Sequence, residues 1–206
     1  MYRVMVVEDQ AMPKKLFEIM LHQSERYELC YAIENAAMAE IYCLRNRIDL
    51  ILMDVCTSDG ESGLDAAKVI KTKFPKIKII IVTSMPEHSF LQRAKAAGCE
   101  SFWYKSADEH ELLSVMDRTM AGESVYPDET PVLTIGAAKS AEFTKSELAV
   151  LRGLVNGKTY AEIAKERGIS VSGVKFHVKN MLQKTGYTSG TRLAVDVVEK
   201  HLILPD

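Results

Sequence analysis

The stretch Ile48-Asp49-Leu50-Ile51-Leu52-Met53-Asp54 decides the fold of the chain, because a nearly continuous apolar run ends in a carboxylate. A run of this length, followed by turn-rich residues from Cys56 to Gly60, is typical of a strand buried on both faces of a parallel sheet. Asp54 would then lie at the carboxyl end of the strand, where open α/β sheets place their chemistry. For a lone Asp, capping of the following turn is the commoner role.

A second strand of this kind, Tyr2 to Val7, also ends in acid, because Glu8 and Asp9 follow it. If both strands are central in one sheet, these two carboxylates and Asp54 meet in one crevice. Carboxylates at such short range raise one another's pKa unless a cation neutralises them. Ligation by oxygen alone suits a hard divalent ion, so the sequence predicts a Mg²⁺ site here.

Two further strands deliver a hydroxyl and an amine to the same sheet edge. The apolar run Ile77 to Val82 is followed by Thr83, and the aromatic run that starts at Phe102 ends in Lys105. An acid pair, a single Asp, a hydroxyl and a Lys thus each follow a strand, in order. This ordered set favours a reactive site over a simple turn cap at Asp54.

The segments between these strands show helical periodicity. Helices are expected at about 13–23, 36–45, 64–74, 91–97 and 108–120, with another strand at 28–33. Leu16, Ile19 and Met20 are the expected buried stripe of the first helix, and Gly98 is the expected left-handed cap of the fourth. Five βα units with short loops predict a doubly wound, five-stranded parallel sheet of flavodoxin-like topology.

Composition favours a soluble, cytoplasmic protein of two modest domains. The chain has 206 residues, enough for two cores, and no apolar run approaches the roughly 18 residues that a membrane span requires. No signal peptide opens it, so we expect no membrane contact. The four cysteines show no C-x-x-C spacing, which indicates reduced thiols; Cys56 would adjoin the metal.

A linker is expected at residues 122–140, which are rich in Gly, Pro and small residues and lack a regular period. Beyond it, Thr144 with Glu147 and Thr159 with Glu162 each form a capping box that opens a helix. Helices are expected at about 144–156, 159–167, 171–184 and 190–201, the second and third joined by a tight turn at Gly168. This is the layout of a helix-turn-helix, whose second helix enters the DNA major groove.

The helix expected at 171–184 carries its charge on one side. Val174, Val178 and Met181 should face the core, which leaves Lys175 and Lys179 together on an exposed face. Two such lysines usually mark a solvated helix face. The helix has three Lys and no acid, however, and residues 141–206 hold ten Lys and Arg against seven Asp and Glu, which favours DNA. For His177, packing beneath the helix and contact with a phosphate remain equally open.

Residues 1–121 resemble the receiver domain of a two-component response regulator, and residues 141–206 resemble the LuxR-type helix-turn-helix of the NarL/FixJ subfamily. The second resemblance is carried above all by residues 174–182, which are similar to the V-K-x-H-x-x-x-[IM]-[LF] motif of the recognition helix. Together they imply a flavodoxin-like receiver followed by a small all-α domain of four helices.

The resemblance also implies roles for individual residues. Asp54 would accept a phosphoryl group from a histidine kinase, and Mg²⁺ would be held by Glu8, Asp9, Asp54 and the backbone carbonyl of Cys56. Lys105 would pair with the phosphate, and Thr83 with Phe102 would form the switch pair. The residues expected to contact promoter DNA are Ser172, Lys175, Phe176 and Lys179.

Three features depart from the pattern of such families. Receivers usually carry Pro four residues after the acceptor, where this chain has Ser58, and the loop to Gly63 is one residue longer than usual. In the second domain Gly173 stands where Thr is usual, which weakens the helix. These departures concern the metal-binding carbonyl, kinase docking and the first turn of the recognition helix.

The leading hypothesis is a DNA-binding transcriptional regulator, not an enzyme, that forms a homodimer on phosphorylation. An alternative is a Mg²⁺-dependent aspartyl-phosphate hydrolase of the haloacid-dehalogenase type, whose D-x-D motif would require a second Asp where this chain has Cys56. A regulator with a relic receiver is a third possibility. The complete set of acids, hydroxyl and Lys argues against it.

Overall fold

Five strands of the N-terminal half pair in parallel in a computed structural model, which describes residues 1–105, 109–200 and 202–203. They are β1 (Tyr2–Val7), β2 (Tyr27–Ile33), β3 (Leu50–Asp54), β4 (Lys78–Thr83) and β5 (Ser101–Tyr104). Their order in the sheet is β2-β1-β3-β4-β5, which confirms the predicted flavodoxin-like topology. All of β3 is buried, as its apolar run predicted.

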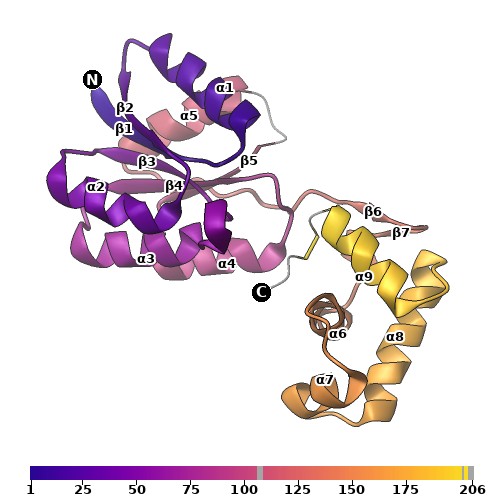
Figure 1. Cartoon of the computed structure of the whole chain (residues 1–206). Helices are drawn as coiled ribbons and strands as arrows, with labels where there is room; N and C mark the ends of the chain where they lie inside the picture. Colours follow the sequence, from indigo (N-terminus) through magenta and orange to yellow (C-terminus); the bar gives the residue numbers. More distant parts are fainter. Residues whose placement is uncertain (106–108, 201, 204–206) are drawn as a thin grey trace. The chain divides into compact units, whose positions relative to one another are not determined.

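Helices cover both faces of this sheet (Figure 1). One face carries α1 (Ala11–His22) and α5 (Glu109–Met120), and the other carries α2 (Ala39–Arg45), α3 (Gly63–Lys73) and α4 (His88–Ala97). Short 3₁₀ turns, η1 (Ala36–Met38) and η2 (Ser58–Gly60), precede α2 and α3. The expected start of α5 at Asp108 lies outside the described residues.

The core beneath α1 and α5 is built from alternate residues of the central strands. Its fully buried members include Val4, Val6, Leu50, Leu52, Ile80, Val82, Phe17, Leu21, Leu112 and Met116. The stripe predicted for α1 was wrong in part, because Ile19 is 45% exposed and Leu16 is only half-buried, whereas Phe17, Met20 and Leu21 are buried. Two overlapping apolar stripes run along α1, and the one that carries the large Phe17 ring faces the sheet.

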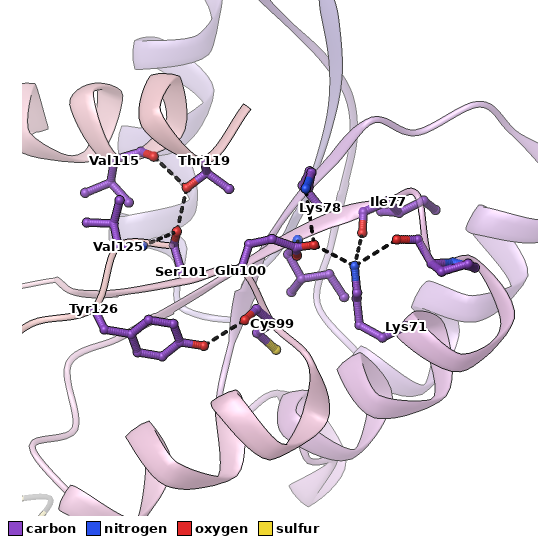
Figure 2. Close-up of polar contacts among 12 residues, drawn as sticks. Lys71, Ile77, Lys78, Cys99, Glu100, Ser101, Val115, Thr119, Val125 and Tyr126 are labelled. Atoms are coloured by element: carbon purple, nitrogen blue, oxygen red, sulfur yellow. Dashed lines mark hydrogen bonds and ion pairs between the residues drawn. The ribbon is translucent and has the colours of Figure 1, made fainter. Parts of the chain in front are cut away.

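The first residues after α5 are held against the edge of β5 (Figure 2). The Phe102 N–H donates to the Val125 carbonyl at 2.9 Å, and the Val125 N–H donates to Ser101 Oγ at 3.1 Å. The Tyr126 hydroxyl donates to the Cys99 carbonyl at 2.8 Å. Residues 125 and 126, within the expected linker, therefore form a fixed part of the receiver unit.

The chain divides into two compact units, formed essentially by residues 1–129 and 130–206. The second begins with a hairpin, β6 (Thr134–Ile135) and β7 (Ala138–Lys139), followed by η3 (Ser140–Glu142), although the sequence indicated no regular structure there. Gly136, in the turn, has φ of +57°, a conformation that favours glycine. Ile135 and Ala138 belong to the buried core of this unit, which is why the hairpin is ordered.

Four helices complete the second unit: α6 (Lys145–Val155), α7 (Tyr160–Arg167), α8 (Val171–Thr185) and α9 (Gly190–Glu199). Both predicted capping boxes are confirmed, Thr144 with Glu147 and Thr159 with Glu162. Gly168 caps α7 in the left-handed conformation, and Ser170 caps α8 through its hydroxyl. The expected end of α9 at His201 lies outside the described residues.

All four cysteines are free thiols. Among the residues that the structure describes, none of the helices combines the length and the apolar character needed to cross a membrane.

Candidate functional site

Three carboxylates meet at the carboxyl edge of the receiver sheet. Glu8 and Asp9 follow β1, Asp54 ends β3, and one oxygen of each lies within 4.8 Å of the others. The strand order reverses between β1 and β3, the point at which open α/β sheets bind ligands. Glu8 and Asp54 are buried, with 0% and 2% of their surface exposed. The predicted acidic cluster is therefore present, and two of its members are shielded from water.

Lys105, directly after β5, is the counter-charge of this cluster. Its Nζ lies 2.9 Å from Asp54 Oδ2 and also forms an ion pair with Glu8. The Lys105 N–H donates to the Thr83 carbonyl at 2.9 Å, which fixes the base of the side chain against β4. The Lys105 side chain is only 7% exposed, so its charge acts at low dielectric. One ammonium nevertheless neutralises only one of three carboxylates.

The environment disfavours the charged forms of both buried acids. Burial raises the pKa of Glu8, and the nearby Asp54 raises it further, against the opposing effect of Lys105. Burial also raises the pKa of Asp54, while Lys105 and the Val55 N–H, which donates to Oδ1 at 2.7 Å, lower it in part. The site thus has a deficit of positive charge.

The donor atoms of the cluster fit a hard divalent cation. Every side-chain donor is an oxygen, which is the ligand type that Mg²⁺ prefers. Glu8 Oε2 is buried and, within the described part of the chain, accepts no hydrogen bond beside its ion pair with Lys105. A second cation would satisfy that oxygen and the excess negative charge.

The expected switch residues, Thr83 and Phe102, belong to the neighbouring strands β4 and β5. Thr83 ends β4 and is fully buried, and it pairs in register with Tyr104. Phe102 is also buried, and its ring packs edge-on against Tyr104 with 5.0 Å between the centroids. Thr83 thus lies at the end of β4, where strand order predicted it, and the switch roles of Thr83 and Phe102 stay predictions.

The loop after Asp54 shows what replaces the usual Pro. The Ser58 N–H donates to the Glu34 carbonyl at 3.1 Å, and Ser58 Oγ donates to the same carbonyl at 2.7 Å. A proline here would have no N–H to donate. Hydrogen bonds to the segment after β2 therefore fix the backbone that a Pro ring would otherwise restrict. The sequence alone did not reveal this contact.

In the second unit, α8 presents its predicted outer face to solvent. Ser172, Lys175, Phe176 and Lys179 are all exposed, and the apolar Phe176 ring is 61% exposed. Val174, Val178 and Met181 are buried in the core, as predicted. His177 is half-buried and meets the Phe176 ring edge-on, with 5.8 Å between the centroids. This face therefore presents cationic and aromatic side chains that another molecule can contact.

Two tyrosines that the sequence analysis did not single out lie beside this face. Tyr160, at the start of α7, and Tyr187, after α8, line a shallow groove together with Lys175 and Lys179. Lysines interleaved with aromatic rings form a surface suited to phosphates and sugars. Their positions outside α8 explain why the recognition-helix pattern did not reveal them.

Each unit matches a known family. Residues 4–117 match the response regulator receiver domain, and residues 141–197 match the bacterial regulatory proteins of the luxR family. The chain is also 32% identical over 160 residues to the response regulator protein VraR of Staphylococcus aureus strain NCTC 8325 / PS 47, which covers 75% of this chain and 76% of VraR. The chain is a response regulator of the LuxR family.

Solved structures of other response regulators share this fold. RcsB of Salmonella enterica serovar Typhimurium, bound to promoter P1flhDC with the phosphomimetic BeF3⁻, has a TM-score of 0.64 at 18% identity over 95% of this chain and 97% of RcsB. A structure of two RcsB dimers bound to two parallel DNAs has a TM-score of 0.62 at 19% identity over 95% and 98%. Membership of the family supports the regulator hypothesis over the hydrolase.

Proposed function

We propose that this response regulator is phosphorylated on Asp54 and that the phosphoryl group controls its binding to promoter DNA. The observation that carries the proposal is the buried cluster of Glu8, Asp9, Asp54 and Lys105 in a chain that also presents a cationic helix-turn-helix. We expect the regulator to lie in the cytoplasm and a histidine kinase to be the donor, since receiver domains take their phosphoryl groups from such kinases.

The chemistry follows from the charges of the site. An Asp54 oxygen attacks the phosphorus of the donor; a bond from that oxygen to phosphorus forms as the phosphorus–nitrogen bond of a phosphohistidine breaks. A bound Mg²⁺, held by Glu8, Asp9, Asp54 and the Cys56 carbonyl, would neutralise the charge that gathers on the phosphoryl oxygens. Lys105 already lies 2.9 Å from Asp54 and exchanges a carboxylate partner for the phosphate.

The new dianion changes the balance around Thr83 and Phe102. A phosphate with three acceptor oxygens offers the Thr83 hydroxyl and Lys105 stronger partners than the carboxylate did. Movement of these side chains then biases the surface formed by α4 and by β5, the strand to which the buried Phe102 belongs. The expected outcome is dimerisation, and the solved structure of RcsB dimers on DNA shows that a relative of this fold binds DNA in that state.

The DNA-binding half of the proposal assigns α8 to the major groove. Ser172, Lys175, Phe176 and Lys179 project from its exposed side, and Tyr160 and Tyr187 flank it. Lys can reach a guanine edge or a phosphate, and Phe176 can contact a thymine methyl. As a regulator, the protein would turn over no free substrate. A hydrolase would not require this exposed face of α8.

Mass measurement with a small-molecule phosphodonor tests the acceptor. Wild-type protein with donor and Mg²⁺ should gain one base-labile phosphate, and Asp54→Asn should gain none. Asp9→Ala should be labelled far more slowly, because a dianionic donor then meets carboxylates without a cation. Asp49→Asn is the matched control, since Asp49 directly precedes β3, at the end of the strand opposite to Asp54. Labelling of Asp54→Asn at the wild-type level contradicts the assignment.

A further inference from the structure

The loop between β3 and α3 closes on itself through one antiparallel bridge, between Cys56 and Ser62. The Thr57 N–H donates to the Glu61 carbonyl at 3.1 Å, and the Gly63 N–H donates to the Val55 carbonyl at 2.9 Å. These two bonds flank the pair, so the backbone groups of Cys56 itself take no part in the bridge.

The bridge sets the direction of the Cys56 carbonyl. That C=O and the Thr57 N–H belong to one planar trans peptide and point in opposite directions. Since the N–H is directed at Glu61, the carbonyl of Cys56 is directed away from Glu61. Any rotation of this peptide plane would break the bond to Glu61.

Hydrogen bonds of the Thr57 side chain restrain the same peptide further. Its Oγ1 donates to the Glu61 carbonyl at 3.0 Å, beside its own N–H, and accepts the Ala36 N–H at 3.0 Å. Thr57 is buried, with 4% of its surface exposed, so water does not replace these partners readily. One hydroxyl therefore joins the loop to itself and to the start of η1.

Neighbouring contacts fix the other sides of this loop. Ser58 donates twice to the Glu34 carbonyl, and Asn35 Nδ2 donates to the Ser58 carbonyl at 3.4 Å. At the α3 end Gly63 lies so close to the acceptor that a Cβ on it would come 1.8 Å from the Asp54 carbonyl oxygen. The peptide after Cys56 is thus held between Asp54 and the segment 34–36.

We propose that Thr57 is a positioning residue for the divalent cation: its hydroxyl fixes the Cys56–Thr57 peptide so that the Cys56 carbonyl is pre-oriented as a ligand. The inference rests on the proposed function, because it takes that carbonyl as part of the Mg²⁺ site. Thr57 and the segment 34–36 would then restrict the loop in place of the Pro that receivers usually carry at position 58. Groups that orient a metal ligand commonly change metal affinity by about 10- to 100-fold when they are removed.

Thr57→Val and Thr57→Ser in the full chain separate this role from simple packing. Val keeps the volume of Thr and removes the hydroxyl, whereas Ser keeps the hydroxyl and removes a methyl. The dissociation constant for Mn²⁺, counted as free ion by electron paramagnetic resonance, should rise about tenfold in Thr57→Val and stay within about twofold in Thr57→Ser. Thr72→Val is the matched control, because the exposed Thr72 hydroxyl on α3 donates to the Lys68 carbonyl of its own helix.

Phosphorylation by a small-molecule donor supplies a second measurement. The Mg²⁺ concentration that gives half the maximal rate should rise in Thr57→Val, while the rate at saturating Mg²⁺ should stay near that of the wild type. Equal Mn²⁺ affinity in Thr57→Val and the wild type, or an equal loss in Thr57→Ser and Thr57→Val, overturns the inference. If Thr57→Val does not fold by circular dichroism, Thr57→Ala takes its place against Thr57→Ser. If Asp9→Ala binds Mn²⁺ with the same dissociation constant as the wild type, the Mg²⁺ site of the proposed function is contradicted instead.

Discussion

At the scale of single residues, Lys105 has two alternative partners, and it cannot pair fully with both at once. Its Nζ neutralises Glu8 and Asp54 while the carboxylates face each other, and it is the expected partner of the phosphate once Asp54 has reacted. Both carboxylates have a raised pKa because burial is the largest influence on each. The site therefore depends on Lys105 most when no divalent cation is bound.

Lys105→Met should destabilise the receiver, because the buried Glu8 and Asp54 lose the ammonium with which both form ion pairs. Breaking a buried pair costs on the order of 3–5 kcal/mol. The loss should shrink as pH falls, because carboxylates with a raised pKa take up protons in the folded state and the repulsion between them ends. Saturating Mg²⁺ should restore part of the lost stability by binding only the folded state. Urea unfolding with and without Mg²⁺ measures both effects.

Lys71→Met is the matched control for this prediction. Lys71 forms an ion pair with Glu100 at 2.7 Å and donates to the carbonyl of Ile77 (Figure 2). It also donates to the carbonyl of Pro75, and these partners precede β4 and β5, at the sheet edge opposite to the acidic cluster. Its removal should also destabilise the receiver, but Mg²⁺ should restore nothing. An equal Mg²⁺ response in the two variants would show that the cation does not replace the charge of Lys105.

The sequence predicted the members of the acidic site because each lies at the end of a strand or directly after one. Parallel strands bring their carboxyl ends to one edge, so Glu8, Asp54 and Lys105 had to converge once the strands were recognised. No comparable rule joins Thr57, in the loop after β3, to Ala36, at the start of η1, which lie 21 residues apart. Such contacts depend on the local path of each loop, and a residue period does not encode that path.

At the scale of the elements, patterns between residues close in the sequence predicted more of the structure than patterns that depend on packing between elements. The capping boxes at Thr144 and Thr159 involve partners three residues apart, and both formed as expected. The hairpin of β6 and β7 escaped prediction because a strand of two residues has no measurable alternation. The stripe predicted for α1 was wrong in part, because packing against the sheet, not the helix itself, decides which of two apolar faces is buried.

Gly173→Ala should stabilise the DNA-binding unit. Gly173 lies in the first turn of α8, where its N–H donates to Ser170 Oγ at 3.0 Å, and its φ is not positive. A Cβ would come no closer than 3.5 Å to a neighbouring atom, which is ordinary contact. The expected gain is about 0.5–1 kcal/mol in the free energy of unfolding, because Ala loses less backbone entropy than Gly. A lower stability in thermal unfolding would contradict this account of the first turn.

Lys179→Ala and Lys175→Ala should weaken promoter binding while Asp54 remains fully phosphorylatable. A lost base contact should cost about 1–3 kcal/mol and relax specificity at one base pair. A lost phosphate contact should instead weaken all sequences alike and lower the salt slope by about one. Binding to promoter and random DNA over a range of salt concentrations distinguishes the two.

Lys145→Ala, which removes an equal charge from the start of α6, is the control for both lysines. It changes the net charge without touching α8. If both α8 variants bind promoter DNA within about twofold of Lys145→Ala, the loss of charge alone explains the effect and α8 is not the DNA-reading helix.

At the scale of the whole molecule, the tether between the two units is shorter than the composition of residues 122–140 indicated. Tyr126 is anchored to the receiver through Cys99, and Leu133 is anchored to the second unit through its N–H, which donates to Ser140 Oγ at 3.0 Å. The steps from 126 to 133 span at most about 25 Å when fully extended. Two of the residues between them, Pro127 and Pro131, further restrict the chain. Each DNA-binding unit is therefore confined to the neighbourhood of its own receiver.

A short tether makes dimerisation an effective control over DNA binding. When two receivers associate, their helix-turn-helix units are held within a few tens of ångströms of each other, the range of two half-sites about 10 bp, or roughly 34 Å, apart. Phosphorylated protein should therefore sediment as a dimer and protect two half-sites, whereas Asp54→Asn should stay monomeric and bind weakly. Sedimentation and footprinting with BeF3⁻, with and without Mg²⁺, measure this. A mass that does not change on addition of BeF3⁻, together with protection of a single half-site, would mean that phosphorylation acts within one chain.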